Sequence, residues 1–353
     1  MTLTLILAGF GHVARRFVAL LDESRDALEA LDIQPVIVGV VTRRHGAVVD
    51  EAGLDANRIA QRLAEGGGKE SASVPSALEW CARLRAPRAR ARPGSQRVEA
   101  RVLVETTTLD VRSGEPAISH VRAAFRTGAH VVTANKGPAA FAWRDLAREA
   151  AEAGVSFMFE GAVMDGVPIF NLVRETMPAV AIRGFRGVVN STTNYLITAM
   201  ERGEPFDRAL RAMQDAGVAE ADPSLDVDGW DAAAKAAAMA NVWLDAGTTP
   251  LAVRREGIGP GTAARAAAAL AAGRRLKLVA SGTGRGRDAD VRVGLQELDA
   301  IDPLAITDGQ ANALELDTWP LGRVVIMQRG GGLEKTAYAL LTDLVTVAAR
   351  LRT

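Results

Sequence analysis

The chain has 353 residues, of which 48% are hydrophobic and 24% are charged. This composition is typical of a folded globular protein and excludes collagen-like, coiled-coil and disordered classes. Lys plus Arg and Asp plus Glu number 42 each, so no net charge attracts the whole chain to nucleic acid or to an anionic membrane. At roughly 100–200 residues per domain, the length predicts two domains or three.

The chain contains a single cysteine, Cys81, which excludes an intramolecular disulfide and a metal site built from several cysteines. The apolar start, Met1–Ala8, has no basic leader and is too short for a signal peptide. The Ala-rich tracts at 232–240 and 263–272 are too short to span a membrane. We therefore expect a cytoplasmic protein with no membrane partner.

The first 160 residues alternate between expected strands and helices. An apolar run, Leu3–Ala8, ends at a glycine turn, a helical pattern covers 15–21, and Pro35–Val41 is the next apolar run. Further strands are expected at 102–106, 130–134 and 155–159, and helices at 115–127 and 141–153. Alternation of this kind predicts a doubly wound α/β domain with a parallel sheet over residues 1–160.

A different pattern follows, with long helical stretches and several later strands. The expected strands are 184–189, 276–280, 291–295, 314–317 and 323–326. They predict a second, α+β domain over 161–333, in which helices cover one face of a sheet. The last helix, 334–353, is amphipathic and could pack on either domain.

Seven arginines lie in the segment Arg83–Arg101. They are compatible with a nucleic-acid patch or with a solvated loop. No aromatic residue lies among them to stack on bases, so we favour the loop and expect no nucleic-acid partner.

The first strand leads into a glycine turn with the spacing Gly9-x-Gly11-x-x-Ala14. The first glycine permits a tight turn, the second lets a pyrophosphate approach the backbone, and a small third residue lets the helix pack on the strand. Free N–H groups at the helix start would face the phosphates. The turn therefore predicts a dinucleotide site, which we assign to Gly9, Phe10, Gly11, His12, Val13 and Ala14.

The end of the second strand indicates which dinucleotide is preferred. A site for NAD would place Asp or Glu there to bind the ribose 2′-hydroxyl. This chain has Arg43 and Arg44 instead, and two guanidinium groups suit a 2′-phosphate. We predict that NADP is preferred over NAD.

Two lysines are candidates for chemistry. Lys136 follows the strand at 130–134, at the edge where open α/β sheets bind ligands. Lys235 lies four residues after Asp231, so both would lie on one helix face. The helix is almost wholly apolar, which predicts that Lys235 is buried and needs a partner. Glu220, Asp222 and Asp226 upstream could hold a substrate ammonium, and their spacing fits no EF-hand loop.

Together these segments resemble homoserine dehydrogenase, which interconverts L-aspartate 4-semialdehyde and L-homoserine with a nicotinamide cofactor. The resemblance runs from Gly9 to the last helix. It rests on Gly9–Ala14, Gly114–Ala117, His130–Pro138, Phe159–Ile169, Asn190–Tyr195, Ala219–Lys235 and Asp302–Leu304. It implies a Rossmann-type doubly wound parallel sheet, a second α+β catalytic and dimerisation domain, a homodimer, and a place in threonine and methionine biosynthesis.

The resemblance also implies roles for individual residues. Lys235 would donate or accept the proton at the reacting oxygen, with Lys136 beside it and Asp231 completing the catalytic set. Glu220 and Asp231 would bind the amino end of the substrate, with Gly217 contributing its backbone. We add Asp226 to these substrate residues because it lies in the same acidic stretch. Thr106 and Thr107 would edge the nicotinamide, with Lys136 and Gly332 also near the cofactor. Glu160 and the carbonyls of Val163, Asp165 and Val167 would form a loop for a sodium or potassium ion. We also expect the two lysines to lower each other's pKa.

Several positions depart from the family pattern. Family members usually have glycine where Ser191 stands and a glycine-rich loop where Met164 and Asp165 stand, and the run Gln328–Gly332 lacks the usual first glycine and the proline. The chain ends with the last helix, so we expect no regulatory domain and no feedback inhibition through one.

Other functions stay open on the sequence. A semialdehyde dehydrogenase that forms a thioester needs a catalytic cysteine, and Cys81 lies in the variable part of the first domain. The alternatives are another NAD(P)-dependent amino-acid or hydroxy-acid dehydrogenase, and a non-catalytic NADP-binding regulatory protein.

Overall fold

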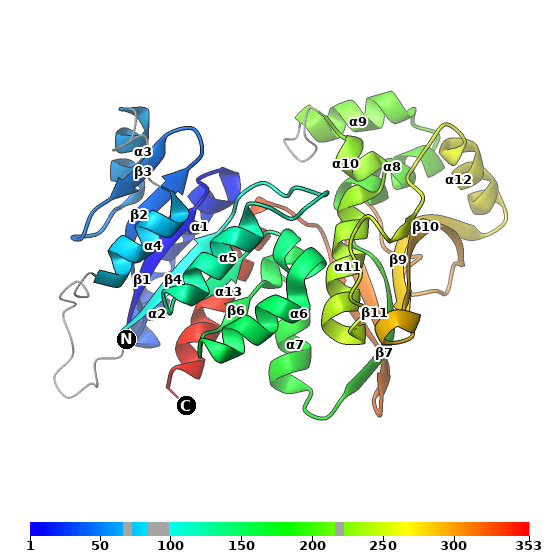
Figure 1. Cartoon of the computed structure of the whole chain (residues 1–353). Helices are drawn as coiled ribbons and strands as arrows, with labels where there is room; N and C mark the ends of the chain where they lie inside the picture. The colour runs from blue at the N-terminus through cyan, green and yellow to red at the C-terminus, as the bar shows by residue number, and fades with distance from the viewer. Residues whose placement is uncertain (66–72, 84–98, 216–221, 353) are drawn as a thin grey trace.

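The computed structural model describes residues 1–65, 73–83, 99–215 and 222–352. Within these residues it contains two six-stranded sheets, which lie side by side with helices between and around them (Figure 1). The mixed α/β architecture confirms the predicted fold class.

The first sheet has the strand order β3-β2-β1-β4-β5-β6. Its strands are β1 (Thr2–Ala8), β2 (Gln34–Thr42), β3 (Gly46–Val49), β4 (Glu99–Glu105), β5 (His130–Thr133) and β6 (Phe157–Met158). All neighbours run parallel except β3, which pairs antiparallel with β2. Every residue of β1 is buried, as expected for a central strand with helices on both faces.

Helices cover both faces of this sheet. They are α1 (His12–Glu23), α2 (Arg25–Ala30), α3 (Ala56–Ala64), α4 (Val74–Arg83), α5 (Ala117–Arg126) and α6 (Gly137–Glu152). The last helix, α13 (Leu333–Arg350), packs beside α1, and its buried leucines share one core with β1 (Figure 1). The C-terminal end of the described chain therefore returns to the first sheet.

The second sheet has the order β12-β11-β7-β9-β10-β8 and is antiparallel except where β8 meets β10. Its strands are β7 (Ala181–Val188), β8 (Arg254–Arg255), β9 (Arg274–Thr283), β10 (Asp290–Asp299), β11 (Asn312–Trp319) and β12 (Gly322–Gln328). The helices of the second half of the chain are α7 (Ile169–Thr176), α8 (Ser191–Glu201), α9 (Phe206–Asp215), α10 (Ser224–Val227), α11 (Trp230–Leu244) and α12 (Thr262–Ala271).

One helix, α11, lies between the two halves of the molecule. It packs on β9 and β10 of the second sheet and on α6 of the first half (Figure 1). Its run of alanines is buried on several sides, which is the pattern of a helix enclosed in a core.

The predicted strands and helices are present in the predicted order. Five elements were not predicted: the strands β3 and β8 and the helices α2, α3 and α4. The strand predicted at 155–159 is shorter in the structure, where β6 has two residues. The helix predicted at 141–153 is α6, which begins earlier, at Gly137, with a proline in its first turn. No helix among the described residues is long and apolar enough to cross a membrane.

Two buried carboxyl groups connect the halves around the 3-10 helix η1 (Glu160–Ala162). Glu160 accepts hydrogen bonds from the backbone N–H groups of Phe170 and Asn171 at the start of α7, at 2.8 and 2.7 Å. Asp343 of α13 accepts from the N–H of Glu160 at 2.8 Å. Burial and the charge of Asp343 raise the pKa of Glu160 to about 8, and burial raises the pKa of Asp343 to about 6.

These raised pKa values predict that stability falls as the pH rises. A carboxyl group whose pKa is raised by folding binds a proton more tightly in the folded state, so ionisation destabilises the fold. For Glu160 the loss extends from its ordinary pKa of 4.5 to its folded value of about 8. The variant Glu160→Gln cannot ionise, so the difference in melting temperature between the wild type and this variant should shrink from pH 5 to pH 8.5. A difference that is constant over this range would contradict the assignment.

Candidate active site

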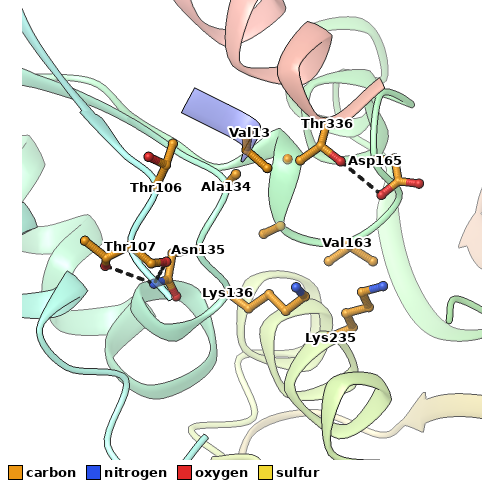
Figure 2. Close-up of a pocket in the computed structure, with 12 residues that line it drawn as sticks. Val13, Thr106, Thr107, Ala134, Asn135, Lys136, Val163, Asp165, Lys235 and Thr336 are labelled. Carbon is orange, nitrogen blue, oxygen red and sulfur yellow. Dashed lines mark hydrogen bonds between the residues drawn. The ribbon is translucent and has the colours of Figure 1, made fainter. Parts of the chain in front are cut away.

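A pocket of about 240 Å³ opens at the carboxyl ends of β4 and β5. Side chains from both halves of the chain line it: Thr106 from the segment after β4, Lys136 from the segment after β5, Asp165 from the loop after η1, Lys235 from α11 and Thr336 from α13 (Figure 2). The carboxyl end of a parallel sheet is the usual ligand site of doubly wound folds.

The structure brings Lys136 and Lys235 together in this pocket, with Asp231 between them. Lys136 Nζ lies 3.1 Å from Asp231 Oδ1, and Lys235 Nζ lies 3.0 Å from Asp231 Oδ2. Figure 2 shows the two lysine side chains side by side in the pocket, Lys136 from the start of α6 and Lys235 from α11. The spacing of Asp231 and Lys235 predicts that they share one helix face, and their 3.0 Å contact confirms it.

Local structure fixes each of the three charged groups. Lys136 is the residue before α6, where Asn135 Oδ1 accepts the Gly137 N–H at 2.8 Å and so shapes the loop. Asp231 lies in the first turn of α11, where a carboxylate is favoured by the helix dipole. Lys235 lies one turn later and also donates to the backbone carbonyl of Val189 at 2.6 Å.

For both Asp231 and Lys235, neighbouring charges shift the pKa in the direction opposite to the shift that burial alone would cause. Burial alone would raise the pKa of Asp231, but Lys136 and Lys235 lower it well below the ordinary value. Burial alone would lower the pKa of Lys235, but Asp231 and Asp165 raise it. The expectation of a lowered pKa was therefore wrong for Lys235, because a carboxylate lies between the two ammonium groups.

Asn190 extends this cluster. Its Nδ2 donates to Asp226 Oδ1 at 2.6 Å and to Asp231 Oδ2 at 2.9 Å. The pKa of Asp226 is raised by burial and by the neighbouring charge of Asp231. Asp226, which the sequence predicts to bind substrate, thus lies beside Asp231. The other two predicted substrate residues, Gly217 and Glu220, lie outside the described residues, as does most of the Arg-rich segment.

The glycine turn has the form that a dinucleotide pyrophosphate requires. Gly9 has a φ of +89°, and a Cβ there would lie 3.0 Å from the carbonyl carbon and oxygen of Thr106. A Cβ on Gly11 would meet nothing within 4 Å, so the space beside this glycine is open. No side chain caps the start of α1, which leaves backbone N–H groups for phosphate oxygens. The residues present therefore fit a bound dinucleotide.

The remaining predicted cofactor residues surround this turn. Val13, Thr106 and Thr107 line the pocket. Arg43 and Arg44 are exposed in the turn between β2 and β3. Gly332 precedes α13, and its N–H donates to Asp165 Oδ2 at 3.1 Å. The glycine run thus reaches a side chain of the pocket.

The predicted cation loop fits an ion only in part. Both carboxylate oxygens of Glu160 accept backbone N–H groups of α7. The carbonyl of Val167 accepts the N–H of Ile169 at 2.9 Å. An ion here would therefore depend on the carbonyls of Val163 and Asp165, and no step of the chemistry is assigned to it.

Comparison with known proteins shows the family of this chain. The family model for homoserine dehydrogenase matches residues 168–345. A homoserine dehydrogenase from Methanocaldococcus jannaschii is 32% identical over 352 residues, which cover 97% of this chain and 98% of that protein. The chain belongs to the homoserine dehydrogenase family. It is therefore an oxidoreductase that acts on a CH–OH group.

Two further members of the homoserine dehydrogenase family are named with a cofactor, and the two cofactors differ. An NAD(+)-dependent homoserine dehydrogenase from Pseudomonas canavaninivorans is 34% identical over 97% of this chain and 95% of its own. A structure of a putative homoserine dehydrogenase from Archaeoglobus fulgidus has a TM-score of 0.81 at 26% identity and covers 98% of this chain and 99% of its own. A hyperthermophilic archaeal homoserine dehydrogenase in complex with NADPH has a TM-score of 0.76 at 25% identity, over 99% of this chain and 98% of its own. Homoserine dehydrogenases use NAD(P).

Sequence reasoning missed three residues that shape this homoserine dehydrogenase pocket. Asn190 bridges two carboxylates, Asn135 shapes the Lys136 loop, and Thr336 donates to Asp165 Oδ1 at 3.3 Å. Both asparagines lie within motifs that support the family resemblance, so their amide side chains could have been recognised as candidates. The sequence around Thr336 gives no such indication, because its partner Asp165 lies in a distant segment.

Proposed function

We propose that this chain interconverts L-aspartate 4-semialdehyde and L-homoserine, with NADP preferred over NAD and Lys235 as the proton donor and acceptor. The observation that carries the proposal is the meeting of Lys136 and Lys235 at Asp231, in a pocket that adjoins the glycine turn. The second class considered from the sequence, a protein that binds NADP without turnover, has no observation in its favour.

The chemistry follows from the charge on the reacting oxygen. Reduction of the aldehyde adds a hydride to carbon and leaves negative charge on oxygen. The nicotinamide, when bound, supplies that hydride or accepts it in the reverse direction. The Lys235 ammonium stabilises the developing charge and delivers the proton that completes the alcohol. In the reverse direction, neutral Lys235 removes the hydroxyl proton.

Asp231 has two tasks in this scheme. It neutralises part of the charge that two ammonium groups bring into one pocket, and it fixes both amino groups at hydrogen-bond distance. Lys136 is thereby held beside Lys235, where it binds substrate and cofactor oxygens. Because Asp231 and Asp165 raise the pKa of Lys235, the lysine is charged at neutral pH and ready to donate its proton.

The NADP preference rests on Arg43 and Arg44. Both are exposed at the end of β2 and form no ion pair with the residues that the structure describes. Their guanidinium groups are available to a 2′-phosphate, which they can bind through charge-assisted hydrogen bonds.

Four further expectations are part of the proposal. We place the domains at 1–160 and 161–333, with α13 on the first. We propose a homodimer formed through the second sheet, whose edge strand β12 exposes Val325. We propose a cytoplasmic enzyme, and a sodium or potassium ion held by the loop after η1.

The first test removes the proposed proton donor. Lys235→Ala should lower homoserine-dependent reduction of NADP at alkaline pH by about 10²–10⁴-fold, the usual contribution of a positioned acid or base. Binding of NADPH, measured by fluorescence titration, should stay near the wild-type value. Lys235→Arg keeps the positive charge but cannot release a proton near neutral pH, so it should not restore turnover. Rapid turnover in either variant would remove Lys235 from proton transfer.

The second test concerns pH. Oxidation of homoserine needs neutral Lys235, so its rate should rise with pH. In Asp231→Asn the charge that raises the pKa of Lys235 is lost, and burial and Lys136 then favour the neutral amine. The rising limb of the pH–rate profile should therefore move to lower pH, whereas Asp231→Glu, which keeps the charge, should move it less. A limb that stays in place in Asp231→Asn would contradict this electrostatic role.

The third test concerns the cofactor. Arg43→Asp should raise the KM for NADP by roughly 10–100-fold, since a hydrogen bond to a charged group contributes about 1.5–3 kcal/mol. The KM for NAD should change little. Arg287→Asp, which makes the same charge change at an exposed site in the second half, is the matched control. Equal effects of Arg43→Asp on both cofactors would refute the assignment.

A further inference from the structure

Glu105 is a fully buried carboxylate that the proposed chemistry does not use. It is the last residue of β4, and its exposed fraction is 0%. The three residues before it, Val102–Val104, form an apolar core strand. A carboxylate in such a place is costly unless hydrogen bonds satisfy its oxygens, so its partners indicate what it does.

The partners of Glu105 form a closed ring of hydrogen bonds beneath the pocket. Oε1 accepts the Thr107 N–H at 3.1 Å and also the Thr107 hydroxyl. The Thr133 hydroxyl lies 3.1 Å from Oε2 and 3.0 Å from the Glu105 backbone carbonyl, so it donates to Glu105 within reach of both atoms, and its oxygen accepts the Asn135 N–H at 2.9 Å. Asn135 Nδ2 then donates back to the Thr107 carbonyl at 2.9 Å. The ring thus joins the carboxyl ends of β4 and β5.

This ring controls two parts of the pocket wall. Thr107 lines the pocket itself. Asn135 precedes Lys136, and its Oδ1 accepts the Gly137 N–H on the other side of that lysine. Figure 2 shows Thr107 bonded to Asn135 on one side of the pocket and Lys136 reaching across toward Lys235. The course of the backbone at Lys136 therefore depends on the ring.

His120 of α5 completes the surroundings of Glu105. Its Nδ1 lies 3.6 Å from Glu105 Oε1, beyond hydrogen-bond length, and has no hydrogen-bond partner among the described residues. The hydrogen bonds that hold the carboxylate thus come from Thr107, which lines the pocket, and from Thr133, the last residue of β5.

We propose that Glu105 is a positioning residue for the reaction, which holds Thr107 and the Lys136 loop so that the Lys136 amino group meets Asp231. The inference rests on the proposed function for its effect on turnover. Its effect on the geometry of Lys136 is independent of that function.

The test compares three variants at position 105 and its partner. Glu105→Ala removes both acceptors and should lower kcat for homoserine oxidation by about 10–100-fold, the cost of misplacing a reacting group by about an ångström. Glu105→Gln should recover most of the loss, because its amide oxygen can accept from Thr107 and its Nε2 can donate to the Thr133 hydroxyl. Thr133→Val breaks one link with little change in volume and should lower kcat in the same direction, so the test survives if Glu105→Ala fails to fold.

Glu201 provides the matched control. It is also a buried carboxylate, and it accepts the Leu276 N–H at 3.0 Å and pairs with Arg275, far from the pocket in the second half. Glu201→Gln should lower the melting temperature but leave kcat within about twofold. A purely structural Glu105 would behave like Glu201, with lost stability and unchanged kcat in the folded fraction, and this result would overturn the proposal.

A readout without turnover separates this inference from the proposed function. In a crystal structure of Thr133→Val or Glu105→Ala without cofactor, the Lys136 Nζ–Asp231 Oδ1 distance should exceed the 3.1 Å of the wild type by more than an ångström. An unchanged distance refutes the positioning role. A wild type that fails to oxidise homoserine refutes the proposed function alone, and the distance still decides the role of Glu105.

Discussion

The structure depends on one carboxylate that lies between two ammonium groups. Two half-buried lysines repel each other, and each loses hydration, so an anion within bonding distance of both stabilises their shared pocket. Asp231 meets this requirement with one oxygen for each lysine. Because Lys136 comes from the first half of the chain and Lys235 from the second, the same contact also fixes the two halves across the pocket.

That contact requires α6 and α11 to approach closely, and the residues between them allow it. The facing segments are small: Gly137, Ala139 and Ala140 on α6, and the buried alanines on α11. Asn241 of α11 adds a polar link, since its Nδ2 donates to the carbonyls of Ala139 and Ala140 at 3.2 and 3.1 Å. Close packing on α6 thus explains why α11 is rich in alanine. The same close packing brings Asp231 and Lys235 of α11 to the pocket.

The sequence predicted those features that depend on local pattern. The buried strand β1, the glycine turn and the pair Asp231–Lys235 each follow from spacing within a few residues. The meeting of Lys136 with Lys235 does not follow from spacing, and only the family resemblance suggested it. The direction of the Lys235 pKa shift was wrong because it depends on where Asp231 and Asp165 point. Short edge strands such as β3 carry too few residues for a periodic signal.

Two departures from the family pattern prove to be neighbours in space. Asp165 binds the N–H of Gly332 and the hydroxyl of Thr336, and Ser191 accepts a hydrogen bond from Asn312 Nδ2 at 3.0 Å. A Cβ on Gly331 would collide with both the Asp165 carboxylate and the Ser191 hydroxyl. The lack of a side chain at 331 leaves room for the Asp165 carboxylate and the Ser191 hydroxyl where they stand, and Asp165 in turn holds the start of α13 against the pocket. The segments around residues 165, 191 and 331, which are far apart in the sequence, therefore pack together at one place in the structure.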